Sequence, residues 1–395
     1  MTNHTKKRVG KRKPGIFERL FLGCTIQETQ VLIPGVLLAA GLVALSVWLT
    51  GLLNASLGFG GLVSYILVVI LAGILVRNLI GLSAIFNPGI SFCLKKLLRL
   101  GIILMGIRLS IFAVLNIGFW GIPIVITCVV SGLVLTIFFG RLLKIPDRLA
   151  TLVAVGTGIC GATAIVATAP AIDAKEEEVA YAVANITIFG IIAMVAYPFL
   201  AHWLFAGDIT MAGLFTGTAI HETAQVAASG LIYDQTFGVT TNPTVADVAM
   251  VTKLVRNVLM AAIIPVMAFI YVKRTGVTED KSERGLTKVI KLFPLFILGF
   301  LLMAILRSIG DASIQGGGLA IGLWQGAQWA EITSGIKEWS GYILATAMAG
   351  VGLGTSFKSM KGLGIKPFYI GLFSAAMVGV VAIIMVFLLG RFVSV

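Results

Sequence analysis

The sequence contains little charge for its length. Only 12% of its 395 residues are Asp, Glu, Lys or Arg, whereas a soluble domain averages about 25%. Hydrophobic residues make up 58% of the chain, and the mean hydropathy is +1.02. A water-soluble fold of this composition would expose large apolar patches, but a bilayer tolerates apolar surface as long as backbone polar groups are satisfied internally. The composition therefore predicts an all-α polytopic membrane protein.

Residues for metal, redox and nucleotide chemistry are also scarce. The four cysteines, Cys24, Cys93, Cys128 and Cys160, have no metal or redox spacing. The sequence has no G-x-x-x-x-G-K-[ST] motif for an ATP motor and no H-E-x-x-H metal motif. We therefore expect no metal, no cofactor and no enzymatic activity. A membrane-embedded enzyme is the alternative, and it would turn over its substrate in detergent without any gradient.

Acidic residues are outnumbered by basic ones, 17 to 30, which gives a formal net charge of +13. Most of the basic residues lie between apolar segments, as membrane topology requires. Nucleic-acid binding would need them gathered on one soluble face. We therefore expect no nucleic-acid partner.

Several apolar segments are long enough to cross a bilayer, which takes about 20 residues. Eleven are predicted: 31–53, 61–80, 97–115, 119–140, 149–170, 179–205, 211–230, 246–272, 292–310, 336–357 and 367–390. The positive-inside rule places a basic N-terminal arm, residues 1–28, in the cytoplasm and the C-terminus outside. Residues 29–395 then form one transmembrane domain. The predicted outer loops are 54–60, 116–118, 171–178, 231–245 and 311–335.

Two parts of the chain resemble each other. Four positions match four others at one constant offset: Gly106, Leu109, Gly118 and Pro123 match Gly350, Leu353, Gly362 and Pro367. The stretch 75–81 also resembles 305–310. Because the matched segments run in opposite directions in the predicted topology, they indicate an inverted repeat, which is typical of secondary transporters. Chance similarity among Gly/Leu-rich helices is the alternative.

A glycine-rich run lies in the middle of segment 149–170. Three glycines within six residues, at 156, 158 and 161, destabilise a helix by about 1 kcal/mol each relative to alanine. An interrupted helix would present N–H groups and a positive dipole end to an anion, and tight helix packing through small residues is the alternative. The run also matches G-x-G-x-x-G, but no strand precedes it, which excludes a dinucleotide site. The substrate-binding candidates here are Thr157, Gly158, Cys160, Gly161 and Thr163.

A second polar run occurs in segment 211–230. Thr218, His221, Glu222 and Gln225 lie at i, i+3, i+4 and i+7 and share one helix face. Ionisable groups at membrane depth usually face a cavity or a partner. We expect Thr223 and Gln225 to bind substrate and His221 or Glu222 to couple a proton. A polar seam between helices is the alternative.

A basic cluster lies in segment 246–272. Lys253, Arg256 and Asn257 share one helix face, and Arg256 is about 15 Å into the helix. Arg108 is a further deep base, in segment 97–115. If these bases and Glu222 all face one pathway, its charge is positive in sum, which favours an anionic substrate. Snorkelling of Arg108 to the interface is the alternative.

These runs resemble a known family. GIILMGIRLS (101–110), GTGICGATAIVATAP (156–170), GTAIHETAQVAASG (217–230) and KLVRNVLM (253–260) are similar to the bacterial YeiH-type inner-membrane proteins, which are named for sulfate export. The resemblance covers nearly all of 20–395. It implies a transporter of the bacterial plasma membrane, related in fold to bile-acid symporters and sodium–proton antiporters, with crossing interrupted helices.

We therefore predict a secondary active transporter of a small anion, such as sulfate or a sulfonate-related ion, that works by alternating access with proton coupling. A sodium-coupled organic-anion symporter and a passive anion channel are the alternatives. The expected partners are the anion, the lipid bilayer and a coupling proton or sodium ion, and a homodimer is a candidate assembly.

Overall fold

The computed structural model describes residues 26–56, 64–275, 295–356 and 365–393. These residues are overwhelmingly helical, and the described ranges contain no β-strand, so the all-α prediction is confirmed. The basic arm 1–28 and the loop between segments 246–272 and 292–310 lie almost wholly outside the described residues.

Within the described ranges, the helices follow one another with short connections. Those of the first half are α1 (Ile33–Ser56), α2 (Tyr65–Leu75), α3 (Asn87–Phe92), α4 (Leu98–Met105), η6 (Gly106–Arg108), α5 (Ile111–Leu142), α6 (Asp147–Val155), η7 (Gly156–Cys160), α7 (Gly161–Thr168) and α8 (Glu176–Leu204). Those of the second half are α9 (Ile209–Ala219), α10 (Thr223–Thr236), α11 (Val245–Thr275), α13 (Phe296–Gln315), α14 (Gly326–Gly354) and α15 (Ile365–Leu389).

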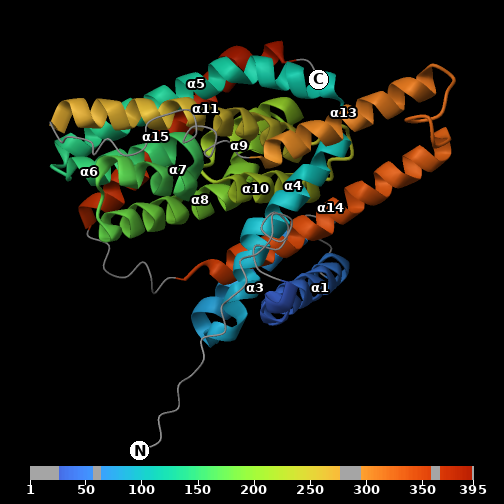
Figure 1. The fold of residues 1–395 in the computed structure, drawn as a ribbon, viewed down its shortest axis with the longest axis horizontal. Coiled ribbons are helices and arrows are strands. Elements are labelled where there is room, and N and C mark those ends of the chain that lie inside the picture. Colours follow the sequence, from blue (N-terminus) through green and yellow to red (C-terminus); the bar gives the residue numbers. More distant parts are fainter. Residues whose placement is uncertain (1–25, 57–63, 276–294, 357–364, 394–395) are drawn as a thin grey trace, which may run out of the picture.

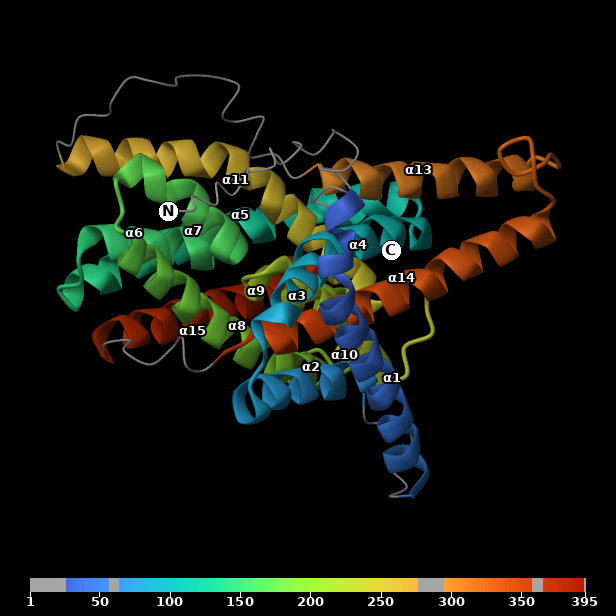
Figure 2. The same ribbon diagram turned by 60° about the horizontal axis from the view of Figure 1, so that its bottom comes forward.

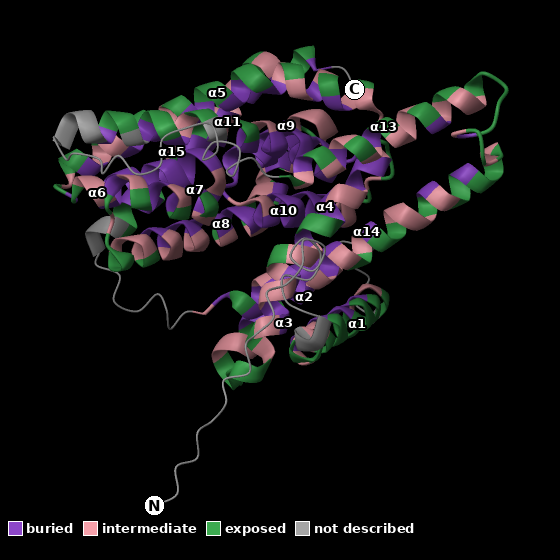
Figure 3. Cartoon of the chain, in the orientation of Figure 1, coloured by how far each residue is buried: buried purple, intermediate pink, exposed green. Residues whose placement is uncertain are grey.

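The outer surface is apolar, as lipid contact requires. Large hydrophobic side chains such as Phe112, Trp203 and Leu298 are more than half exposed, and Figure 3 shows exposed residues along α1, α5 and α13. Among the described residues, six helices are long and apolar enough to span a membrane, or seven if the bent α11 is one span. The protein is therefore polytopic, but the predicted count of eleven is not confirmed.

Several predicted boundaries were wrong. The predicted segment 97–115 ends in the structure at Arg108, and the predicted outer loop 116–118 lies inside α5. Ser110 caps α5 by accepting a hydrogen bond from the Ala113 N–H at 3.1 Å, which sets its start well before 119. Most of the predicted loop 311–335 is also helical, because α13 continues to Gln315 and α14 begins at Gly326.

The helices form two groups (Figures 1 and 2). The core body contains α5 to α11 and α15, which pack against one another. The flanking body contains α1 to α4, α13 and α14, in which α14 packs along α2 and α4. In Figure 1 the core body is on the left, and the flanking body extends to the right and below.

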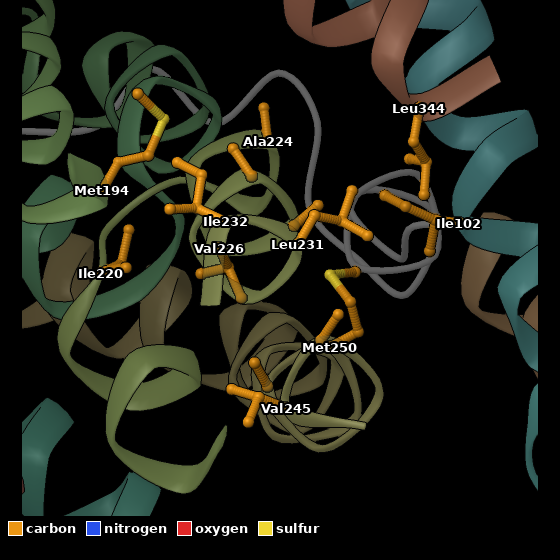
Figure 4. Close-up of a cluster of buried hydrophobic side chains, with 14 of the residues drawn as sticks. Ile102, Met194, Ile220, Ala224, Val226, Leu231, Ile232, Val245, Met250 and Leu344 are labelled. Atoms are coloured by element: carbon orange, nitrogen blue, oxygen red, sulfur yellow. The ribbon is translucent and has the colours of Figure 1, made fainter. Parts of the chain in front are cut away.

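The two bodies meet through an apolar cluster and a few polar contacts. Figure 4 shows Ile102 and Leu344 of the flanking body in the same buried cluster as Leu231 and Met250 of the core body. Polar contacts include three hydrogen bonds: Ser64 Oγ to Gln235 Oε1 and Ile111 N to Ser308 Oγ, both 2.8 Å, and Ile66 N to Gln235 Oε1 at 3.4 Å. No described ion pair other than Arg108–Asp247 joins the bodies.

Packing within the core body has a two-fold pattern. α5 packs on α15, and α6 contacts α5 as α9 contacts α15. α8 contacts α7 as α11 contacts α10, and each of α8 and α11 also contacts the other interrupted helix. The inverted repeat predicted from the sequence, in which the end of α4 matches the end of α14, stays a prediction, and its position Gly362 lies outside the described residues.

Candidate functional site

The first interruption occurs where the glycine-rich run predicts it. α6 continues into the π-helical turn η7, and α7 restarts at Gly161. Gly161 has φ +54°, and a Cβ there would collide with the Glu222 side chain. Because only glycine adopts this backbone conformation readily, the residue type explains why the helix breaks here. The prediction of an interrupted helix is confirmed.

A second interruption lies in segment 211–230, which the sequence predicts as one crossing. α9 ends at Ala219, Ile220 and Glu222 have extended backbone, and α10 begins at Thr223. No glycine or proline occupies 220–222, so no local helix breaker marks the position. The only signal in the sequence is the echo of the first run, GTGI at 156–159 and GTAI at 217–220.

Small residues bring the interrupted helices close to their neighbours. A Cβ on Gly217 would collide with the Ala249 carbonyl of α11, and one on Gly190 of α8 would collide with Gln225. α9 therefore lies against the backbone of α11. This approach places the basic residues of α11 beside both interruptions.

Arg256 bonds to the carbonyl ends of both interrupted helices. Its Nε donates to Gly158 O at 3.0 Å, and its Nη2 donates to Thr157 O. Its Nη1 donates to Thr218 O at 2.6 Å and to Ile220 O at 3.1 Å. The side chain is 1% exposed, so every one of these bonds is shielded from water.

Lys253, one turn earlier on α11, also donates to backbone carbonyls at both interruptions. Its Nζ donates to His221 O at 2.5 Å, to Ile220 O at 3.0 Å and to Ile159 O at 3.4 Å. Carbonyl ends of helices carry about half a negative charge each. Lys253 and Arg256 therefore neutralise the two carbonyl ends, and their N–H groups point at the backbone.

The amino ends of α7 and α10 lie next to a second polar group. Glu222 Oε1 accepts a hydrogen bond from Ala162 N at 3.1 Å, and Glu222 N donates to Gln225 Oε1 at 3.3 Å. Thr223 Oγ1 accepts from Asn257 Nδ2 at 3.2 Å and lies 3.7 Å from Cys160 Sγ. We call Cys160, Ala162, Glu222, Thr223 and Asn257 the amino-end cluster.

Exposure differs between the two groups. Cys160, Ala162, Glu222 and Thr223 are half-buried, whereas Lys253 is 0% exposed. Asn257 is 2% exposed, and no described group donates to its Oδ1. Four of the five members of the amino-end cluster are therefore more exposed than the basic pair.

The remaining predicted site residues have mixed positions. Thr157 and Gly158 contribute carbonyls to Arg256, and Gly158 therefore presents an acceptor where we expected an N–H donor. Thr163 is exposed on α7. His221 is 1% exposed, and its Nδ1 has no partner among the described residues.

We call the place where the two interruptions, 156–160 and 220–222, lie beside Lys253 and Arg256 the crossing. Arg108 does not contact it. Its Nε lies 3.3 Å from Asp247 Oδ1 at the start of α11. Asp247 is 1% exposed and also accepts bonds from Thr244 N and Oγ1, both at 3.0 Å. Sequence reasoning missed Asp247, because it lies at the edge of segment 246–272, where acidic residues are usually solvated.

Within the part of the chain that the structure describes, no three His, Cys, Asp or Glu residues gather in a way that could hold a metal ion. The chemistry available there is instead that of hydrogen-bonding and ionisable groups: two basic side chains, one carboxyl group, and the N–H groups of two helix ends.

Comparisons with known proteins agree on one family of membrane proteins. The family model described as conserved hypothetical protein 698 matches residues 34–371. A UPF0324 membrane protein of Corynebacterium glutamicum is 35% identical over 325 residues, which cover 81% of this chain and 84% of the relative. A UPF0324 membrane protein of Fusobacterium nucleatum is 31% identical over 312 residues, 79% of this chain and 86% of the relative. A UPF0324 membrane protein of Clostridium tetani is 27% identical over 365 residues, which cover 90% of this chain and 97% of the relative.

Proposed function

Because the chain belongs to the UPF0324 family of membrane proteins, we propose that it is a secondary active transporter that carries a small anion across the membrane by alternating access. The observation that carries the proposal is the crossing of two helices that are both interrupted near their middles. Non-helical backbone at membrane depth occurs where it is buried in protein or lines a water-filled cavity, and secondary transporters bind substrates at such interruptions.

Charge at the crossing favours an anion. Lys253 and Arg256 contribute two positive charges and Glu222 one negative charge, so the fixed side chains leave a surplus of one positive charge. The carbonyl ends are bonded to the two cations, whereas the amino ends of α7 and α10 carry a partial positive charge toward the half-buried surface. An anion that enters there meets favourable dipoles.

Sodium coupling is less well supported. Sodium would need backbone carbonyls and carboxylates as ligands, and the carbonyls of Thr157, Gly158 and Ile159 already accept bonds from Arg256 or Lys253. We therefore favour a proton as the coupling ion, with Glu222 or His221 as the group that carries it.

Alternating access is supported by the division into two bodies. The contacts between them include a few hydrogen bonds, the Arg108–Asp247 ion pair and one apolar cluster. A body that holds the whole crossing can change its position relative to the flanking body without breaking the bonds of Lys253 and Arg256.

Binding is tested first. Sulfate, methanesulfonate, formate, acetate and chloride are added separately to the purified protein, with and without sodium, and thermal unfolding is followed. A ligand at 100 times its dissociation constant stabilises the folded state by about 2.7 kcal/mol. We expect stabilisation by at least one anion without sodium. Stabilisation only by sodium together with acetate or formate would favour the symporter alternative.

Transport is tested with the same anions in proteoliposomes. We expect uptake that saturates with concentration and that a proton gradient drives above equilibrium. Uptake that neither saturates nor responds to a gradient would indicate a channel. Chemical conversion of a substrate in detergent would indicate an enzyme instead.

Membrane orientation belongs to the same proposal. The basic residues Arg141, Lys144 and Arg148 at the α5–α6 connection lie on the cytoplasmic side by the positive-inside rule, in the plasma membrane. Reporter fusions that are active only inside or only outside the cell, placed at each terminus, test the cytoplasmic N-terminus and the external C-terminus. A homodimer stays a prediction.

A further inference from the structure

Glu222 occupies the amino end of α7 as an internal anion. Its Oε1 accepts the Ala162 N–H at 3.1 Å. Gly161 makes this approach possible, since a Cβ at that position would collide with Glu222 Cγ, and its φ of +54° turns the chain at the start of α7. The carboxylate therefore holds the position that an anionic ligand would take at this helix end.

A buried acceptor on the side chain that contacts Thr223 lacks a donor. Asn257 Nδ2 bonds to Thr223, the residue after Glu222, and no described group donates to the Asn257 Oδ1 of the same carboxamide. The Asn257 side chain is almost fully buried, at 2% exposed. Buried polar atoms normally have partners. An ionised carboxylate cannot donate a hydrogen bond, whereas a protonated Glu222 can.

Most members of the amino-end cluster are more exposed than the basic pair. Ala162, Glu222 and Thr223 are half-buried and Thr163 is exposed, whereas Lys253 and Arg256 are buried and bonded to carbonyls. The amino end of α7 is thus more exposed than either cation.

From these observations we propose that the substrate anion and the Glu222 carboxylate are alternative occupants of the amino end of α7, so that one proton is taken up by Glu222 for each monovalent anion bound. The inference rests on the proposed transport function and specifies how its site is coupled. No bond other than the O–H of Glu222 is made or broken, and the proton comes from the aqueous phase that supplies the anion.

Charge conservation explains why the anion is monovalent. With Glu222 ionised, the crossing has one surplus positive side-chain charge from Lys253 and Arg256. With Glu222 protonated and a monovalent anion bound, the sum is unchanged. Moving charge within a membrane is costly. Because the crossing carries the same net charge with and without the anion, the free-energy cost of its movement is similar in the two states.

Among the titratable groups near the amino end of α7, Glu222 is the one that we assign as the proton acceptor. The titratable or charged groups on the elements that meet here are Cys160 before α7, His221 in the connection, Lys253 and Arg256 on α11, and the buried Cys128 on α5, which packs against η7 and α11. The two cations are held by carbonyls, and His221 is 1% exposed. α8 packs against α10 with Gly190 facing Gln225 and offers no titratable side chain at that contact.

Anion binding is measured with purified protein between pH 6 and pH 8. The probes are methanesulfonate, formate, acetate and chloride, which do not titrate in this range. In the wild type we expect the affinity to fall up to ~100-fold from pH 6 to pH 8, because each anion bound is linked to one proton. In Glu222→Gln we expect less than ~3-fold change, since the neutral amide mimics the protonated carboxyl.

Proton uptake is measured directly in weakly buffered solution with a pH-sensitive dye. When the anion is added to the wild type, the protein should take up about one proton per site, and the pH of the solution should rise accordingly. Adding the anion to Glu222→Gln should leave the pH unchanged. The matched control is Glu331→Gln, an exposed carboxyl on α14, which should behave as the wild type.

Each result decides the proposal. Wild-type binding that is independent of pH, or a Glu222→Gln variant with the wild-type pH dependence, would overturn it and leave the proposed transport function intact. Binding of no probe by the wild type would overturn both. If Glu222→Gln does not fold, the wild-type pH dependence and proton uptake decide on their own.

Discussion

Arg256 is the residue whose role changes most between sequence and structure. Its depth in segment 246–272 predicts a partner for its charge, with Glu222, a carbonyl or an anionic substrate as candidates. In the structure its guanidinium contacts four backbone carbonyls. Two lie 98 and 99 positions earlier in the chain, at Gly158 and Thr157, and two lie 36 and 38 positions earlier, at Ile220 and Thr218. A planar guanidinium with five donors suits such a set, so Arg256 holds the crossing together.

Substitution of Arg256 should therefore lower stability as well as transport. Arg256→Ala leaves buried carbonyls without donors, and we expect a loss of about 3–5 kcal/mol. Arg256→Lys keeps the charge but cannot reach all four carbonyls, and we expect its free energy of unfolding to fall by about half as much as that of Arg256→Ala. The measurement is unfolding of the purified variants in detergent, with exposed Arg141→Ala as the control, expected within about 0.5 kcal/mol of the wild type. Wild-type stability of Arg256→Ala would contradict this structural role.

The interrupted helices are the elements that define the site. The first interruption could be predicted because three glycines weaken the helix locally, and Gly161 supplies the positive φ. The second could not, because residues 220–222 contain no breaker. That interruption depends on distant partners, since the free carbonyls of Ile220 and His221 are satisfied by Lys253, more than 30 positions away.

Thiol cross-linking checks that the two interruptions meet. Cys160 Sγ lies 3.7 Å from Thr223 Oγ1, a separation that a disulfide can close with small adjustments. In a background with Cys24, Cys93 and Cys128 replaced by alanine, Thr223→Cys should form a disulfide with Cys160 on mild oxidation. The readout is loss of maleimide labelling that a reductant restores.

The control for this cross-link is Thr241→Cys, in the exposed loop before α11, which should stay labelled after oxidation. Full labelling of Thr223→Cys after oxidation would show that the ends of α7 and α10 do not approach each other as described.

At the scale of the whole molecule, Arg108 and Asp247 connect the two bodies. Arg108 ends the α4–η6 segment of the flanking body, and Asp247 begins α11 of the core body. Asp247 is almost fully buried and Arg108 is 21% exposed, so the pair is shielded more than a surface ion pair. If the core body changes position during transport, this contact must break in each cycle.

A double-mutant cycle tests the contact. Arg108→Gln and Asp247→Asn, singly and together, should give a coupling energy of about 0.5–3 kcal/mol in unfolding, and each single variant should alter the transport rate more than anion affinity. The control is the Arg307–Asp311 pair at 2.6 Å, which lies within α13 and should contribute about 0.3–0.5 kcal/mol with no change in transport. Zero coupling between Arg108 and Asp247 would remove the pair from any role between the bodies.

Composition, hydropathy and glycine content were enough to predict the protein class, the depth of the basic residues and the first interruption, because these properties act locally. Tertiary structure alone decided the second interruption, the true limits of α5 and α14, and the partners of Arg108 and Arg256. Those features depend on contacts between residues far apart in the chain. A buried polar group bonds to whichever partner the packing brings near, and no local pattern specifies that partner.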